Sequence, residues 1–138
     1  MSQAATTLTL LERAREGLLE SYAATATSTR YLTASLAAMR AAAAVLAARP
    51  RPPSGSSGRH DLWQVLGQSV PELHEWAELF EVVTAERVAV ETALVRVSAR
   101  EADDVLRAAE EFLCLVEVRL GLPRRESFPL RLAPTRTA

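Results

Sequence analysis

The sequence lacks lysine altogether, and it has one cysteine, two histidines and few aromatic residues. With Cys114 alone, no disulfide can form within the chain, which favours a reducing compartment and predicts a cytoplasmic protein. We expect Cys114 to be a small, buried apolar side chain within a helix. The low aromatic content, 5%, and the absence of strand-like alternation favour closely packed helices over a thick sheet core.

Long apolar runs are also missing. The longest, residues 41–48, is mostly alanine, and a membrane-spanning helix needs roughly 20 apolar residues. The first residues lack a basic stretch followed by an apolar run, so we expect neither a signal peptide nor a membrane partner.

Motifs for a metal, a cofactor or a nucleophile are absent as well. Neither His60 nor His74 belongs to an HxxxH pair, and no CxxC occurs. The stretch SGSSG lacks the lysine and the preceding strand of a phosphate-binding loop. We therefore predict no metal site, no cofactor and no catalytic residue of these classes.

Helical signals dominate what is present. Between Ser98 and Gly121, apolar residues recur at spacings of three and four, and Ser98 with Glu101 forms a capping box. Gly121, followed by Pro123, is a stop signal. This pattern predicts a helix over 99–120, and weaker versions predict helices near 9–26, 29–48 and 71–94, with a short one at 61–67.

The residues expected to cap these helices are short polar ones. Thr9 with Glu12 fits a second capping box at the start of helix 9–26. Ser28 or Thr29 is expected to cap the next helix, and Asp61 the short one.

Together these elements predict an all-α fold, an antiparallel bundle of four main helices plus one short helix. The alanine-rich helix 29–48 is predicted to lie at its centre, and a Pro-, Gly- and Ser-rich loop follows it. We expect residues 8–121 to form the bundle and the Pro- and Arg-rich residues 122–138 to be a flexible tail. The predicted core contains Leu36, Met39, Leu46, Trp76, Phe80, Val105, Phe112 and Val116.

Charge is distributed unevenly along the chain. Residues 28–60 contain five arginines and no acidic residue, whereas residues 61–97 contain seven acidic residues and two arginines. A basic side can attract nucleic-acid phosphates, mate with the acidic side of a second copy, or serve solubility alone. The candidate nucleic-acid-binding residues are Arg49, Arg51, Arg59, Arg96 and Arg100.

Three stretches are distinctive in combination: AAAVLAAR at 42–49, PEL-x-EWA at 71–77 and READDVLRAAEEFL at 100–113. With the Pro/Arg loop and the short helix between the first two, they resemble a small actinobacterial family of the HEPN superfamily. The resemblance implies an antiparallel helical bundle that commonly dimerises. It also singles out Glu101, Asp103 and Asp104 as family-signature polar residues.

Many HEPN domains are metal-independent ribonucleases or toxins that use an arginine followed, after four to six residues, by a histidine. In them the histidine moves protons at the ribose 2′-OH and the arginine stabilises phosphate charge. This sequence departs from that pattern, because the arginine positions before both histidines are occupied by other residues. They are Pro53, Ser54 and Gly55 before His60, and Gly67, Gln68 and Ser69 before His74.

Three functions remain open at this point. The favoured one is a non-catalytic binding or scaffold domain, homodimeric, which binds a protein partner or a nucleic acid. The second is a diverged ribonuclease or toxin component, and the third is a module that binds RNA or a nucleotide without cleavage. The second would use Arg96, Arg100, Asp103 and Asp104; the third would use Arg49, Arg51, Arg59 and Arg96.

Overall fold

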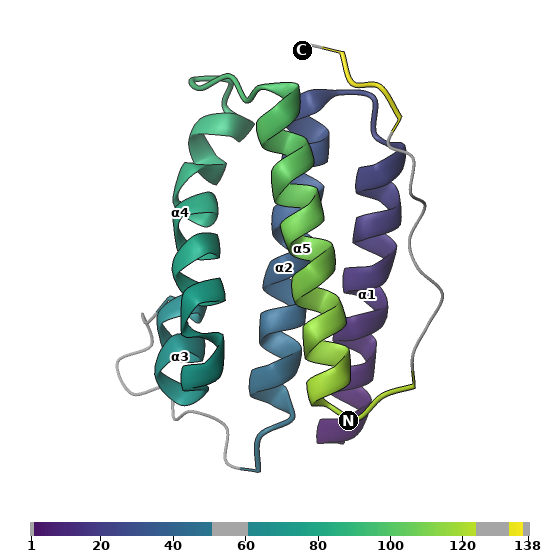
Figure 1. Cartoon of the computed structure of the whole chain (residues 1–138), viewed down its shortest axis with the longest axis vertical. Coiled ribbons are helices and arrows are strands. Elements are labelled where there is room, and N and C mark those ends of the chain that lie inside the picture. Colours follow the sequence, from purple (N-terminus) through teal and green to yellow (C-terminus); the bar gives the residue numbers. More distant parts are fainter. Residues whose placement is uncertain (1, 51–60, 124–132, 137–138) are drawn as a thin grey trace.

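The computed structural model describes residues 2–50, 61–123 and 133–136. Of these residues, 79% are helical and none forms a strand, which confirms the predicted fold class. The elements, in order, are α1 (Gln3–Ala23), α2 (Thr27–Ala47), α3 (Leu62–Ser69), the 3₁₀ turn η1 (Pro71–Leu73), α4 (His74–Glu91) and α5 (Ala99–Arg119) (Figure 1). None of these helices is both long enough and apolar enough to cross a membrane.

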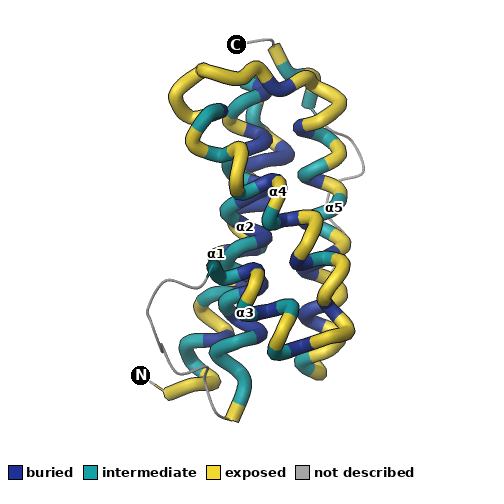
Figure 2. The backbone as a smooth tube through the Cα atoms, turned by 90° about the vertical axis from the view of Figure 1, so that its left-hand side faces the viewer, coloured by how far each residue is buried: buried dark blue, intermediate teal, exposed yellow. Residues whose placement is uncertain are grey.

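Helix α2 lies at the centre of the bundle, as predicted. It packs against α1, α5, α4 and α3, and Figure 2 shows buried positions along its length. α1, α2 and α5 lie alongside one another, while α3 and α4 form a hairpin on the other side of α2 (Figure 1).

The face of α2 that is most deeply buried differs from the predicted one. Leu36, Met39 and Leu46 are only half-buried, so their assignment to the deep core is wrong. Alanines occupy the closest contacts instead, because a small side chain lets two helix backbones approach while larger ones fill the edges. At one such contact, a Cβ on Gly17 of α1 would lie 3.4 Å from Cβ of Ala37. The fully buried alanines of α2 are Ala34, Ala37, Ala38, Ala41, Ala42 and Ala44.

An aromatic cluster joins the α3–α4 hairpin to α5. Trp63 stacks on Phe80 with ring centroids 5.2 Å apart, and Phe112 lies 5.5 Å from Phe80. Trp76 lies 5.7 Å from Phe112, so both tryptophans pack on the same phenylalanines. Phe80, Phe112 and Val116 are buried as predicted, whereas Trp76 and Val105 are only half-buried.

The predicted start of the first helix is wrong. α1 begins earlier than expected, since the Ser2 hydroxyl oxygen accepts the Ala5 N–H at 3.1 Å. Thr9 and Glu12 therefore lie inside α1 and form no capping box at its start. The predicted cap at the start of α3, Asp61, is confirmed: its carboxylate accepts the Trp63 N–H at 3.3 Å.

The start of α2 has no side-chain cap. Its N-cap residue is Ala26, so neither Ser28 nor Thr29 fills that role. The N–H of Thr27 instead donates to the carbonyl of Arg136 at 3.2 Å. A distant segment of the chain thus satisfies a donor that no local side chain reaches.

Cys114 is exposed on α5, so the expectation of a buried cysteine is wrong. The core stripe of α5 passes through the adjacent Leu113 and through Val116, both buried. Because successive helical residues point about 100° apart, a residue next to the stripe can face solvent.

Candidate functional site

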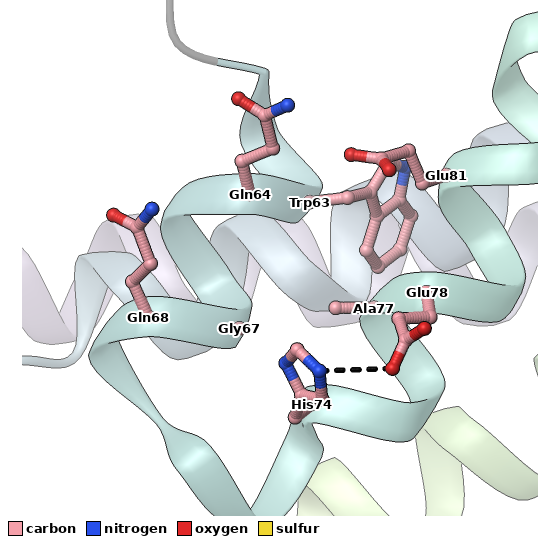
Figure 3. Close-up of a pocket in the computed structure, with 8 residues that line it drawn as sticks. All are labelled: Trp63, Gln64, Gly67, Gln68, His74, Ala77, Glu78 and Glu81. Atoms are coloured by element: carbon pink, nitrogen blue, oxygen red, sulfur yellow. Dashed lines mark ion pairs between the residues drawn. The ribbon is translucent and has the colours of Figure 1, made fainter.

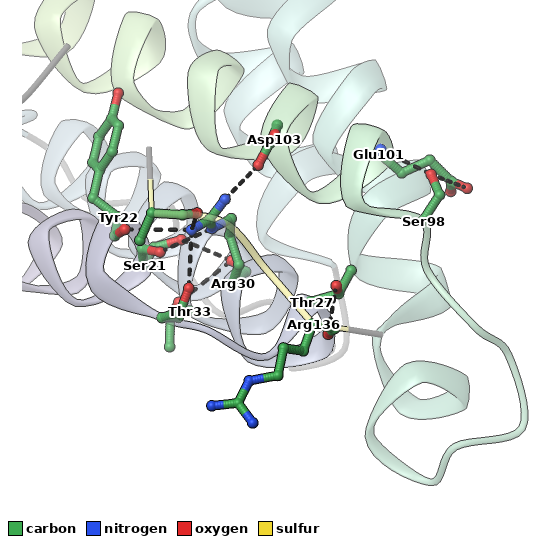
Figure 4. Close-up of polar contacts among 11 residues, drawn as sticks. Ser21, Tyr22, Thr27, Arg30, Thr33, Ser98, Glu101, Asp103 and Arg136 are labelled. Carbon is green, nitrogen blue, oxygen red and sulfur yellow. Dashed lines mark hydrogen bonds and ion pairs between the residues drawn. The ribbon is translucent and has the colours of Figure 1, made fainter. Parts of the chain in front are cut away.

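The start of α5 carries the residues singled out by the family resemblance. The Ser98 hydroxyl oxygen accepts the Glu101 N–H at 3.0 Å, and the same hydroxyl donates to the Glu101 carboxylate at 3.2 Å (Figure 4). Ser98 therefore caps α5 as predicted. Glu101 contacts the capping side chain, and this contact gives it a structural role at the helix start.

Asp103 is paired with an arginine that the sequence analysis did not single out. Arg30 Nη1 donates to Asp103 Oδ1 at 2.6 Å (Figure 4). The Arg30 side chain is 1% exposed and that of Asp103 is 31% exposed. A buried guanidinium needs a counter-charge, so Asp103 neutralises Arg30 and fastens α5 to α2.

The remaining donors of Arg30 are also used. Nε donates to the Ser21 carbonyl at 3.2 Å, and Nη2 donates to the Ala24 carbonyl at 2.9 Å and to the carbonyl of Ala133. Arg30 thus ties the end of α1, the start of α5 and the described tail residues 133–136 to α2. Arg30 lies four residues before Ala34 on the buried stripe of α2, a face that the sequence analysis did not assign to the core.

The predicted nucleic-acid-binding arginines do not form one surface. Arg96 and Arg100 are exposed beside the start of α5, while Arg49 follows the far end of α2 and donates to the Ser69 carbonyl at 2.8 Å. These two places are the opposite ends of the bundle (Figure 1), and a helix of the length of α2 spans roughly 30 Å. Arg51 and Arg59 lie outside the described residues.

A pocket of about 270 Å³ lies beside Arg96. Thr27 and Ser28 from the start of α2 line it, together with Glu91 and Val97. Asp104 is exposed on α5 and makes no ion pair with another described residue. The structure therefore gathers Arg96, Arg100, Glu101, Asp103 and Asp104 at one end of the bundle, and leaves Arg49 at the other.

The described histidine lies away from this cluster. His74 begins α4, and its Nε2 lies 2.8 Å from Glu78 Oε1 (Figure 3). Arg96 follows the opposite end of α4, which an 18-residue helix places roughly 27 Å away. His60 lies outside the described residues.

His74 and Glu78 line a pocket of about 330 Å³ between α3 and α4. Trp63, Gln64, Gly67 and Gln68 of α3 border it, together with Ala77 and Glu81 of α4 (Figure 3). Sequence reasoning missed this pocket, because it is created by the packing of α3 on α4. Among the described residues, no group of three His, Cys, Asp or Glu side chains is placed to hold a metal ion.

A family model described as SAV_6107-like HEPN matches residues 21–117. The chain belongs to this HEPN family. The matched segment contains α2 to α4 and all but the last two residues of α5, so Arg30, Asp103 and the α3–α4 pocket all belong to the HEPN part of the chain. Comparison with curated proteins and with solved structures found no match.

Proposed function

We propose that this HEPN domain is a non-catalytic binding domain that acts as a homodimer in the cytoplasm. The first support is the arrangement of the acid–base groups. Cleavage at a ribose 2′-OH needs a group that exchanges protons near neutral pH, and histidine is the usual one. His74 is far from Arg96, and Asp103, the carboxylate that a diverged site would use, holds Arg30.

The second support, which carries the proposal, is a group of exposed apolar side chains on two neighbouring helices, the α4–α5 strip. It consists of Leu79 and Val82 on α4 and Leu115 and Val118 on α5, which are 39 to 66% exposed. The two helices face each other through Trp76 and Phe112. Exposed apolar side chains on adjoining helices are typical of a protein–protein interface.

A second copy of the chain is the partner that the charges of α5 favour. Arg107 and Glu111 are both exposed, one turn apart, on the outer face of this helix. When two copies of α5 pair antiparallel about a two-fold axis, each Arg107 meets Glu111 of the second copy. The contact is then self-complementary.

The oligomeric state in solution tests this proposal. We expect a dimer by sedimentation or light scattering at micromolar protein, and a monomer when Leu79 and Leu115 are both changed to glutamate. Leu19→Glu is the matched control, because Leu19 is 47% exposed on α1, outside the strip. A monomeric wild type, or equal dissociation by the control, would contradict the dimer.

Incubation with labelled RNA in EDTA tests the non-catalytic part. We expect no cleavage above background. Arg96→Ala is the informative variant, because Asp103→Ala would also unpair the buried Arg30. Cleavage by the wild type that Arg96→Ala abolishes would establish the diverged ribonuclease or toxin component instead.

Binding of RNA or a nucleotide without cleavage is the second candidate, and the pocket beside Arg96 favours it. The exposed guanidinium of Arg96 supplies positive charge there, and such charge attracts phosphate. Under this candidate, RNA binding weakens with salt and with Arg96→Ala but not with Arg49→Ala, whose side chain lies at the other end.

A further inference from the structure

Several hydrogen-bond acceptors line the pocket between α3 and α4. Glu78 and Glu81 line it from α4, and the side-chain amides of Gln64 and Gln68 border it from α3 (Figure 3). Trp63 and Ala77 supply apolar surface between them. The homodimer and the α4–α5 strip use none of these residues.

Close approach of the two helices shapes this pocket. A Cβ on Gly67 would lie 3.3 Å from His74 Nδ1 and 3.5 Å from the Ala77 Cβ. Glycine within a helix costs about 1 kcal/mol relative to alanine, yet a larger side chain here would press on His74. Gly67 thus lets α3 lie close to α4 at the wall of the pocket.

The pocket lies in the most acidic part of the described chain. Residues 61–91 contain seven acidic residues and one arginine, a net charge of −6. Glu72 is paired with Arg119 and Glu91 with Arg87, and Glu78 lies 2.8 Å from His74 Nε2. Glu81 is half-buried in the pocket and makes no ion pair with another described residue, so its carboxylate remains available to a cation.

We propose that this pocket binds an organic cation, an alkylammonium or alkylguanidinium group. Ionised carboxylates only accept hydrogen bonds, so their ligand must donate, and charged N–H donors give the strongest pairs. An anion is disfavoured by the surrounding negative charge. A bare metal ion lacks the ligands it needs, since no such cluster exists in the described part of the chain.

The apolar surface of the pocket explains why the cation carries an alkyl chain. Trp63 and Ala77 contact methylene groups while the charged end reaches Glu78 and Glu81. The volume, about 330 Å³, is at the small end of the range for small-molecule sites. The cation is either a free diamine-type molecule or the arginine or lysine side chain of a partner protein.

Titration of the full-length protein with two probes distinguishes these sources. Agmatine represents the free cation, and N-acetyl-arginine amide represents a side chain within a polypeptide. The readout is the NMR signal of the Trp63 indole N–H, which donates to Thr84 Oγ1 at 2.8 Å beside the pocket. Saturable binding of agmatine alone indicates a free molecule, and preferential binding of the arginine amide indicates a protein partner.

Three variants make the experiment decisive. Glu81→Gln should weaken binding about tenfold, because it removes one charge-assisted hydrogen bond. Glu75→Gln changes the same charge on an exposed position of α4 outside the pocket, and it should leave affinity nearly unchanged. Gln64→Glu adds a carboxylate at the pocket wall and should tighten binding severalfold.

Unchanged thermal unfolding of each variant shows that its fold is intact. If neither probe shifts the Trp63 signal saturably, or if Glu75→Gln and Glu81→Gln weaken binding equally, the proposal is overturned. The second result would mean that acidic charge on α4 attracts cations without a defined site. Either result leaves the oligomeric state, and so the proposed homodimer, untouched.

Discussion

Arg30 joins several distant parts of the chain. Its guanidinium is buried and donates to Asp103, to the end of α1 and to the carbonyl of Ala133. A buried charge is tolerated only when its partners are all in place. Asp103, which the family resemblance marks as a signature residue, is thus the electrostatic partner of Arg30 and links α5 to α2.

The first prediction concerns this pair. Asp103→Asn leaves the buried charge of Arg30 without compensation and should lower the free energy of unfolding by roughly 3 kcal/mol. Asp104→Asn is the matched control, since Asp104 is the next residue, is exposed and has no ion pair among the described residues. Its effect should stay within about 0.5 kcal/mol. Denaturant unfolding measures both, and equal effects would show that Asp103 is only a surface carboxylate.

At the scale of the elements, α4 and α5 end in the same way. In each, the N–H of the third residue past the helix donates to a carbonyl of the last turn: Leu94 to Ala89 at 2.8 Å, and Leu122 to Glu117 at 3.0 Å. This arrangement requires a left-handed residue just before. Gly121 fills that position after α5 with φ of 73°, whereas Ala93 fills it after α4 with φ of 59°.

The second prediction uses this difference. Alanine in the left-handed region is strained by its Cβ, by about 1 kcal/mol, so Ala93→Gly should stabilise the protein by about 0.5–1 kcal/mol. Gly121→Ala, at the equivalent position of α5, should destabilise it by a similar amount, and nothing lies within 4 Å of the added Cβ. Thermal unfolding of the two variants should shift in opposite directions. Shifts of the same sign would mean that packing outweighs backbone strain.

At the scale of the whole molecule, the two tyrosines of the chain link helices across the bundle. The Tyr31 hydroxyl donates to the Val83 carbonyl at 3.1 Å, between α2 and α4. The Tyr22 hydroxyl donates to Glu110, between α1 and α5. Burial is the largest cause that raises the pKa of Tyr31 to about 12, and the negative charge of the nearby Glu86 carboxylate is the second. Burial and the hydrogen bond to Glu110 raise the pKa of Tyr22 as well.

The third prediction is the resulting loss of stability in alkali. Both pKa values are higher in the folded state than the ordinary value of 10.0, so the unfolded chain loses these protons first. The stability that the neutral hydroxyls provide is complete below about pH 10 and falls as the pH rises towards 12. Denaturant midpoints across this range should decline, and Tyr31→Phe should flatten the decline. Equal declines in the variant and the wild type would contradict the assignment to Tyr31.

Local patterns were enough to predict the fold class and most helices. The capping box at Ser98, the cap at Asp61 and the glycine stop at Gly121 depend on residues a few positions apart. Both partners of such a contact lie within a few positions of each other, so a short stretch of sequence is enough to predict it. The central place of α2 followed as well, because its small residues allow close approach on several sides.

Tertiary packing decided the features that join distant parts of the chain. Arg136 completes the start of α2 across 109 positions, and Asp103 meets Arg30 across 73. The exposure of Cys114 and the half-burial of Leu36 depend on how far each helix is rotated against its neighbours. The α3–α4 pocket forms where those helices pack together, and Gly67 allows their close approach. Helical periodicity specifies which residues share a face of one helix. Which two faces meet depends on the side chains of both helices, so it is decided only when the helices pack.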